Sequence, residues 1–262
     1  MAISFVGFNG DNVINGGNLS IDLTAASPSA PSDGDLCIGL SYVFDRSGNE
    51  GRIGNALSYT PLVDNTTGTY RLRVAWKNFV TGDTPVAIEG SGNANDGTVG
   101  QVYIFRGHDS STPFDVTTTE TNATSTNPDP PAIVPSSDDC MIVAMSGSSN
   151  IDSTPGTVAS YTVITGRAAN DINPARVNTA YRLLSGGGGA SENPAAWSSW
   201  SSGVWVSVTA AIRPAGVAAG QPYAKRMGGV GFVQGFRRGQ NTNLWRKAGE
   251  LLIPNKGRLI YG

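Results

Sequence analysis

Hydrophobic and polar residues alternate along several short stretches of the chain, and this period of two is typical of β-strands with one face toward a core. The clearest examples are residues 70–76, YRLRVAW, and residues 204–209, VWVSVT. Clusters of Gly, Asn and Ser at 90–97 and 185–189 separate such stretches, and these residue types accept the positive φ angles of tight turns. The pattern predicts an all-β body, a β-sandwich or jelly-roll-like domain of about eight to ten strands.

Segments of the first half of this body recur in the second half, in the same order. Their offsets along the chain are 104, 102, 105 and 107 residues. Neither half can bury the apolar face of a sheet alone, so we expect the two copies, about 31–107 and 135–213, to share one core with an approximate internal twofold. The matching pairs are 31–40 with 135–144, 57–60 with 159–162, 71–77 with 176–182, and 102–106 with 209–213.

Three further segments complete the predicted body. Residues 3–8 and 19–23 add two strands near its start. Residues 122–135, NATSTNPDPPAIVP, form the predicted crossing between the halves, because their prolines disfavour pairing in a central strand.

Composition excludes several classes of protein. The chain has 262 residues, of which only 15 % are charged, and helix formers are scarce, so a helical bundle is excluded. Its apolar stretches are far shorter than the roughly 18 to 20 residues that a membrane helix needs. The first ten residues, MAISFVGFNG, lack a basic region followed by an apolar one, so we expect no signal peptide.

Charge divides the chain near Pro214. Residues 214–262 hold eight of the 18 Lys and Arg residues and one of the 20 Asp and Glu residues. Residues 1–213 therefore hold ten basic and nineteen acidic residues. We expect an acidic body over 1–214 and a basic, extended C-terminal arm over 215–262 that binds an acidic partner surface. The alternative is an arm that folds back on its own acidic body.

The arm has isolated apolar residues without a lasting helix or strand period. Ordering its backbone costs about 1 kcal/mol per residue, and a thin arm buries too little of itself to recover that cost. We therefore expect it to pair with another surface, with 251–254 and 258–261 added as strands to an exposed sheet edge. The predicted contact residues are Phe232, Phe236, Arg237, Arg238, Trp245, Arg246, Lys247, Leu252, Ile253, Arg258, Ile260 and Tyr261.

Cations beside aromatic residues in the arm are also the ingredients of single-strand nucleic-acid binding. The acidic body would repel phosphate, however, and Arg–carboxylate pairs at a protein interface explain the same residues more simply. We expect a protein partner and no nucleic acid.

Candidate catalytic and metal-binding residues are few. His108, Asp109 and Ser110 have the letters of a hydrolase triad, but sequence neighbours do not present three side chains to one another, and Pro113 marks a turn. Residues 9–12 and 93–97 resemble cation loops only in composition, so we interpret both as hairpin turns. We expect no catalytic residue, no metal and no cofactor, and thus no enzyme.

Two cysteines are too few for a disulfide framework. Cys37 and Cys140 each lie in an apolar run, where cysteine behaves as a small buried hydrophobe. A disulfide between them is the alternative.

Trp197 and Trp200 lie in a Ser-rich segment, WSSWS. Two indoles there can stack on sugar rings, which makes this pair the strongest candidate for binding a host surface glycan. A Trp where a loop joins a strand more often caps the core, however, and that is the other interpretation of this pair.

Three motifs resemble a domain common in accessory virion proteins of tailed bacteriophages. The motifs are 34–38 (GDLCI), 106–115 (RGHDSSTPFD) and 211–215 (AIRPA), and the family carries "GDLLV", "YRGVD…PID" and "ALRPA". His108 stands where the pattern often has an aliphatic residue. The likeness covers about residues 30 to 215 and leaves out the arm.

This resemblance implies a non-enzymatic structural protein located in the virion. Its role would be head decoration, or a place in a fibre or collar. The implied partners are other virion proteins of the capsid, tail or collar, and copies of the chain itself. Together with the basic arm, the resemblance predicts a displayed β-sandwich anchored by its C-terminus.

Overall fold

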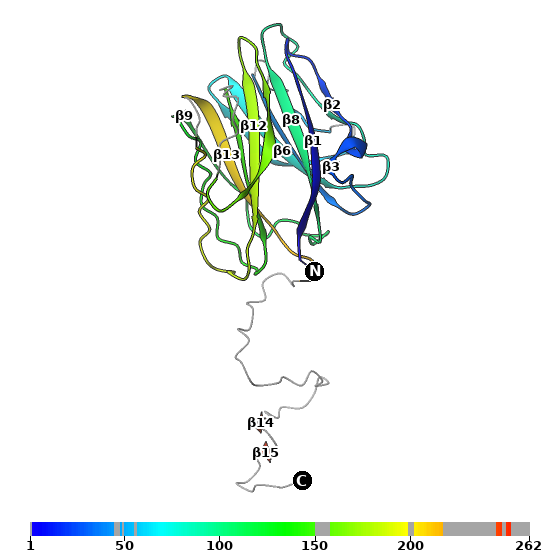
Figure 1. Ribbon diagram of the computed structural model, residues 1–262, viewed down its shortest axis with the longest axis vertical. Helices are drawn as coiled ribbons and strands as arrows, with labels where there is room; N and C mark the ends of the chain where they lie inside the picture. Colours follow the sequence, from blue (N-terminus) through cyan, green and yellow to red (C-terminus); the bar gives the residue numbers. More distant parts are fainter. Residues whose placement is uncertain are drawn as a thin grey trace. The chain divides into compact units, whose positions relative to one another are not determined.

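The computed structural model describes residues 2–44, 48, 50–54, 57–149, 158–198 and 202–216, with the backbone of two short strands at 245–247 and 250–252. The chain divides into two units, Met1–Tyr223 and Ala224–Gly262. In the first unit, two main antiparallel sheets pack face to face as a β-sandwich (Figure 1). The predicted all-β fold class is confirmed.

Each main sheet is built from one half of the chain. The first sheet has the strand order β3-β1-β8-β4-β6-β5, and the second has the order β11-β12-β10-β13-β9. The first comprises β1 (Ser4–Val13), β3 (Ser27–Pro28), β4 (Leu36–Phe44), β5 (Thr60–Thr67), β6 (Tyr70–Asn78) and β8 (Thr98–Arg106). The second comprises β9 (Thr119–Ser125), β10 (Met141–Ser148), β11 (Thr162–Ala169), β12 (Ala175–Leu183) and β13 (Gly203–Ile212).

The same strand order occurs in both sheets, since β1-β8-β4-β6-β5 corresponds to β9-β13-β10-β12-β11. Ladder registers give the residue-by-residue correspondence. Leu36 pairs with Asn78, and its counterpart Met141 pairs with Leu183, an offset of 105 on both strands. The offset of 104 read from the sequence around residues 31–40 is therefore wrong by one residue. The alignment of these two segments rests on turn residues before the strand. A turn can gain or lose a residue without changing how the strands pair.

Two sequence predictions placed strand residues in loops. Residues 122–125 belong to β9, which pairs with β13, so the crossing between the halves begins after Ser125. Residues 9–12 were predicted as a hairpin turn, but they lie inside β1 and pair with β8. Both stretches are polar because they lie near a sheet edge, where side chains meet solvent.

Side chains from both sheets form the inner core. Alternate residues of β4, including Ile38 and Leu40, meet residues of the second sheet such as Val143 and Val208, and all of these are fully buried. The sheets approach so closely at Gly147 that a Cβ there would lie 2.2 Å from Cδ2 of Tyr42. The two copies of the module thus bury one shared apolar layer.

Over the central strands β4, β8, β10 and β13, the outer face of each sheet is also buried. On the first sheet, Cys37 and Ile104 pack under a ribbon of β2 (Leu19–Ile21) and β7 (Val86–Ile88), beside the 3-10 helix Leu23–Ala25. On the second sheet, Ile142 packs with Ile133, from the segment between β9 and β10, and with Leu184, from the segment between β12 and β13. This burial on two faces explains why β4 and β10 read as continuous apolar runs instead of alternating.

Both cysteines are free thiols. Cys37 belongs to the cluster on the outer face of the first sheet, and Cys140 to the cluster on the outer face of the second. The sandwich separates them, so the disulfide alternative does not hold. Burial raises the pKa of each thiol to about 12.

The folded protein is expected to show no fast-reacting thiol toward Ellman's reagent at pH 8. Only the thiolate reacts, and burial both blocks access and keeps the thiols protonated. Absorbance of the released thionitrobenzoate measures the reaction, and two equivalents should appear once guanidinium unfolds the chain. Rapid labelling of the native protein would contradict the buried placement.

Candidate functional site

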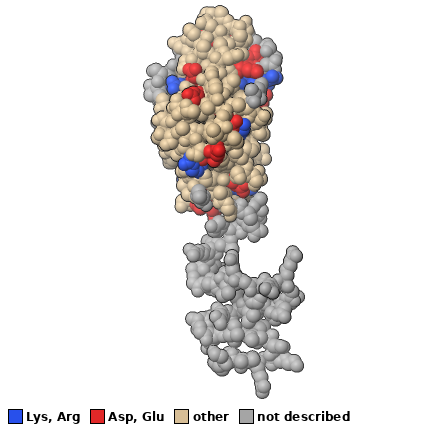
Figure 2. Space-filling view, turned by 90° about the vertical axis from the view of Figure 1, so that its right-hand side faces the viewer, with Lys and Arg blue, Asp and Glu red and all other residues tan. Residues whose placement is uncertain are grey.

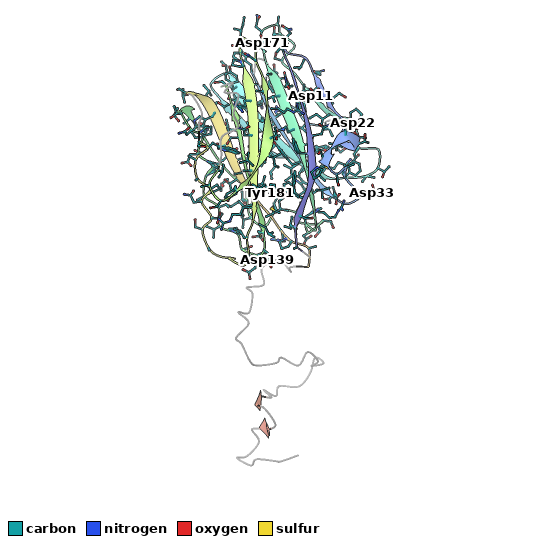
Figure 3. The ribbon with its side chains drawn as sticks, viewed as in Figure 1. Asp11, Asp22, Asp33, Asp139, Asp171 and Tyr181 are labelled. Atoms are coloured by element: carbon teal, nitrogen blue, oxygen red, sulfur yellow. The ribbon has the colours of Figure 1, made fainter. Side chains whose placement is uncertain are left out.

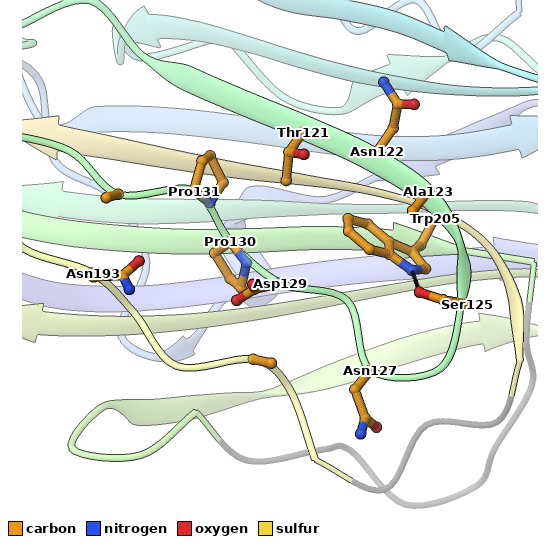
Figure 4. A pocket seen from close by; sticks show the side chains of 12 residues that line it. Thr121, Asn122, Ala123, Ser125, Asn127, Asp129, Pro130, Pro131, Asn193 and Trp205 are labelled. Carbon is orange, nitrogen blue, oxygen red and sulfur yellow. Dashed lines mark hydrogen bonds between the residues drawn. The ribbon is translucent and has the colours of Figure 1, made fainter.

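A groove opens on the outer side of the second sheet, beside its edge strand β9 (Figure 4). Four stretches of chain form it: β9, the proline-rich segment 127–132, residues 193–196, and β13, which contributes Trp205. Its volume is about 570 Å³, within the range of small-molecule sites. Its lining consists of Thr121, Asn122, Ala123, Ser125, Asn127, Asp129, Pro130, Pro131, Ala132, Asn193, Ala196 and Trp205.

Among the described residues that line the groove, Trp205 of β13 is the one aromatic side chain. Its indole N–H donates to Ser125 Oγ across 3.0 Å, which fixes the orientation of the ring (Figure 4). The residue is only 5 % exposed, so the ring is a floor that a ligand touches along one part.

Polar groups around this floor are of three kinds. Ser125 and Thr121 supply hydroxyls, Asn127 and Asn193 supply amides, and Asp129 supplies the one carboxylate of the lining. Among the described residues that line the groove, none is Lys, Arg or His. The site can therefore accept and donate hydrogen bonds but offers no cation to an anionic ligand.

Trp197, one of the two Trp residues predicted to bind a glycan, does not line the groove. It is fully buried and packs with Val158 and Ala180. The structure thus places its indole as a core cap, the alternative interpretation, and leaves no ring face for a sugar. Trp200 lies outside the described residues.

A buried ion pair fixes the end of β13, where the body meets the C-terminal segment. Arg213 Nε lies 3.1 Å from Asp115 Oδ1, and Asp115 is fully buried. Arg213 also donates to Thr112 Oγ1 at 2.9 Å and to the backbone oxygen of Asp115 at 3.1 Å. Backbone bonds continue past the pair, since Ala215 N donates to Gly107 O at 2.8 Å. The chain is therefore held as far as residue 215.

The first half has a counterpart of this pair at the corresponding end of β8. Arg106 Nη2 lies 2.7 Å from Asp35 Oδ2. The Arg106 side chain is 48 % exposed, whereas that of Arg213 is 8 % exposed. Arg106 donates to both carboxylate oxygens of Asp35, whereas Arg213 donates to one carboxylate oxygen of Asp115, and the two arginines differ strongly in access to water.

His108, Asp109 and Ser110 do not form a triad. Asp109 Oδ1 accepts hydrogen bonds from the backbone and hydroxyl of Ser111 and from the backbone of Thr112, which lower the pKa of Asp109. His108 Nε2 lies 2.8 Å from Asn78 Oδ1 instead. The predicted turn is confirmed.

Within the C-terminal unit, Trp245, Arg246 and Lys247 form β14 (Trp245–Lys247), and Leu252 belongs to β15 (Glu250–Leu252). The two strands pair antiparallel, Trp245 with Leu252 and Lys247 with Glu250. Leu251 and Leu252, predicted to pair with another sheet, here pair within their own unit. The other predicted contact residues lie outside the described residues: Phe232, Phe236, Arg237, Arg238, Ile253, Arg258, Ile260 and Tyr261.

Carboxylates do not gather on the face of the body that Figure 2 shows, where acidic groups are scattered. Asp139 and Asp171 lie at opposite ends of the sandwich (Figure 3). In the part of the chain that the structure describes, no three His, Cys, Asp or Glu residues come close enough to bind a metal ion. The same part contains no helix with the length and hydropathy needed to cross a membrane.

Comparison with protein-family models, with curated proteins and with solved structures finds no match to this chain.

Replacing Arg213 by Gln is expected to lower the free energy of unfolding by about 3 kcal/mol, because it leaves a buried carboxylate without its cation. The comparison variant Arg106→Gln also leaves a buried carboxylate, since the Asp35 side chain is 4 % exposed, but the Arg106 side chain is 48 % exposed and solvent screens the pair, so a smaller loss is expected. Urea unfolding followed by tryptophan fluorescence measures both. Equal losses would show that burial does not distinguish the two pairs.

Asp115 should make stability depend on pH in the acid range. Burial alone would raise its pKa, but hydrogen bonds from Ser137 and Ser136 outweigh this and lower it. A folded-state pKa below the unfolded value means that the stabilisation is complete above about pH 4 and is lost as the pH falls through the folded pKa. Unfolding free energies between pH 2 and 5 should therefore fall less steeply with acid in Asp115→Asn than in the unchanged protein. An unchanged slope would contradict this role.

Proposed function

We propose that this protein is a non-enzymatic structural component of a virus particle of the tailed-phage type. Its β-sandwich is displayed, and its basic C-terminal segment anchors it to other virion proteins of the capsid, tail or collar, or to further copies of itself. The resemblance of three sequence motifs to accessory virion proteins supports the class of particle. The observation that carries the anchoring role is the charge division of the chain.

Ion pairs within the body strengthen this difference in charge between the body and the C-terminal segment. In the described part of the body, at least seven Lys and Arg side chains lie in ion pairs with carboxylates. The body has nineteen acidic residues against ten basic ones, so most of its cations are neutralised locally while acidic groups remain in excess. Residues 214–262 carry eight cations against one carboxylate. Those cations are suited to an acidic partner surface.

Bonds at the C-terminal end of the body support the anchoring role, because they connect residues 213–215 firmly to the sandwich. Pro214 forms an antiparallel bridge with His108, and Asp109 N donates to Arg213 O at 2.9 Å. Together with the buried Arg213–Asp115 pair, these bonds hold the backbone in place from β13 to residue 215. A partner that grips the segment beyond therefore holds the whole body.

Removing residues 217–262 is expected to abolish incorporation into particles while the body remains folded, because every body contact described above lies before residue 217. Incorporation is measured by quantitative blotting of purified particles, and folding by the thermal unfolding midpoint. Normal incorporation of the truncated chain would contradict the anchoring proposal.

A charge test separates anchoring from loss of chain length. Arg237→Glu is expected to reduce incorporation, since it opposes an acidic partner surface. The control Arg167→Glu makes the same change in charge at an exposed position of β11 and should leave incorporation unchanged. Equal effects of the two variants would mean that net charge, and not the C-terminal segment, sets incorporation.

A further inference from the structure

The outer layer of the first sheet is a filled core. The β2–β7 ribbon presses Leu19, Ile21, Val86 and Ile88 onto it, and each of these side chains is at most 2 % exposed. Ile88 packs so tightly that a Cβ on Gly100 of β8 would lie 2.1 Å from its Cδ1. No room for a ligand remains under this ribbon.

The second sheet has a ribbon at the corresponding place in the chain. Residues 128–133 follow β9 as β2 follows β1, and residues 192–197 lie between β12 and β13 as β7 lies between β6 and β8. Ile133 and Glu192 exchange backbone hydrogen bonds of 2.8 and 2.9 Å, and Trp197 N donates to Pro128 O at 2.8 Å. The two segments therefore run side by side and antiparallel, as β2 and β7 do.

The second ribbon also covers its sheet, but its exposed positions differ in kind. Ile133 and Trp197 are buried in the outer clusters of the second sheet, as Leu19 and Ile88 are on the first. Asp129, Pro131, Asn193 and Ala196 are not buried and line the groove beside β9. The groove is thus a surface feature formed where this ribbon meets the edge of the second sheet.

We propose that this groove binds a neutral saccharide. Sugar hydroxyls both donate and accept, so they match the Asn193 amide, and they supply donors to the Asp129 carboxylate. The carbon-bound hydrogens of a sugar ring suit the apolar surface of Trp205 and the prolines.

Charge narrows the class of saccharide. The groove holds one carboxylate and, among its described lining residues, no cation. An acidic sugar or a sulfated chain would therefore meet repulsion with no compensating ion pair. Because Trp205 is mostly buried, a sugar touches only part of the indole, and binding at a single groove should be weak.

The test uses the full chain and a panel of neutral saccharides: glucose, galactose, mannose, N-acetylglucosamine and N-acetylgalactosamine, free and as oligosaccharides. Saturation-transfer NMR detects weak binding to the free sugars, and an array of immobilised oligosaccharides extends the panel. Sialylated and sulfated oligosaccharides and a Ser/Thr-rich peptide are included for comparison. At least one neutral saccharide is expected to bind in preference to the charged ones.

Two groove variants and one control locate the binding. Asp129→Ala and Asn193→Ala should each weaken it by about tenfold through lost hydrogen bonds. Asp11→Ala removes an exposed carboxylate from β1 of the first sheet and should leave it unchanged. All three variants should keep the unfolding midpoint of the unchanged chain, because each residue is exposed. The proposal is overturned if no neutral saccharide binds, if only charged saccharides or the peptide bind, or if neither groove variant weakens the binding.

Discussion

The central strands of both sheets are buried on both faces, and the rest of the structure depends on covering all four surfaces. The two inner faces bury each other, which requires two copies of the module in one chain. The two outer faces need a covering layer, which the connections after β1, β6, β9 and β12 supply. On the second sheet the groove lies beside the edge strand β9, next to the covering segments. The requirement to cover these surfaces thus accounts for the fold and the repeat.

The fold could be predicted to a large extent because its long strands carry strong local signals. Runs such as residues 70–76 and 204–209 alternate, and the repeated segments fixed which strands correspond. β9 was missed because its sequence, TETNATS, contains no large apolar residue. The β-pairing of residues 9–12 was missed for the same reason, since the partner strand β8, and not their own side chains, makes them a strand.

The candidate site was much less predictable, because two regions far apart in sequence build it, residues 121–132 and residues 193–196 with Trp205. Nothing in the spacing of Ser125, Asp129, Asn193 and Trp205 indicates that they meet. Trp197 and Trp205 both lie near a loop-to-strand junction, and only the packing around them separates a core cap from a groove floor. Charge patterning, in contrast, was readable directly, since the division at Pro214 depends on no tertiary contact.

The position of β13 has a mechanical consequence. The C-terminal segment continues directly from this strand, which forms eight residue pairs with β10 on one side and seven with β9 on the other. Antiparallel hydrogen bonds run perpendicular to the strands. A pull along the axis of β13 therefore loads both ladders in shear, so that many bonds share the force at once, whereas a tether attached to an outermost strand and pulled sideways would be unzipped bond by bond.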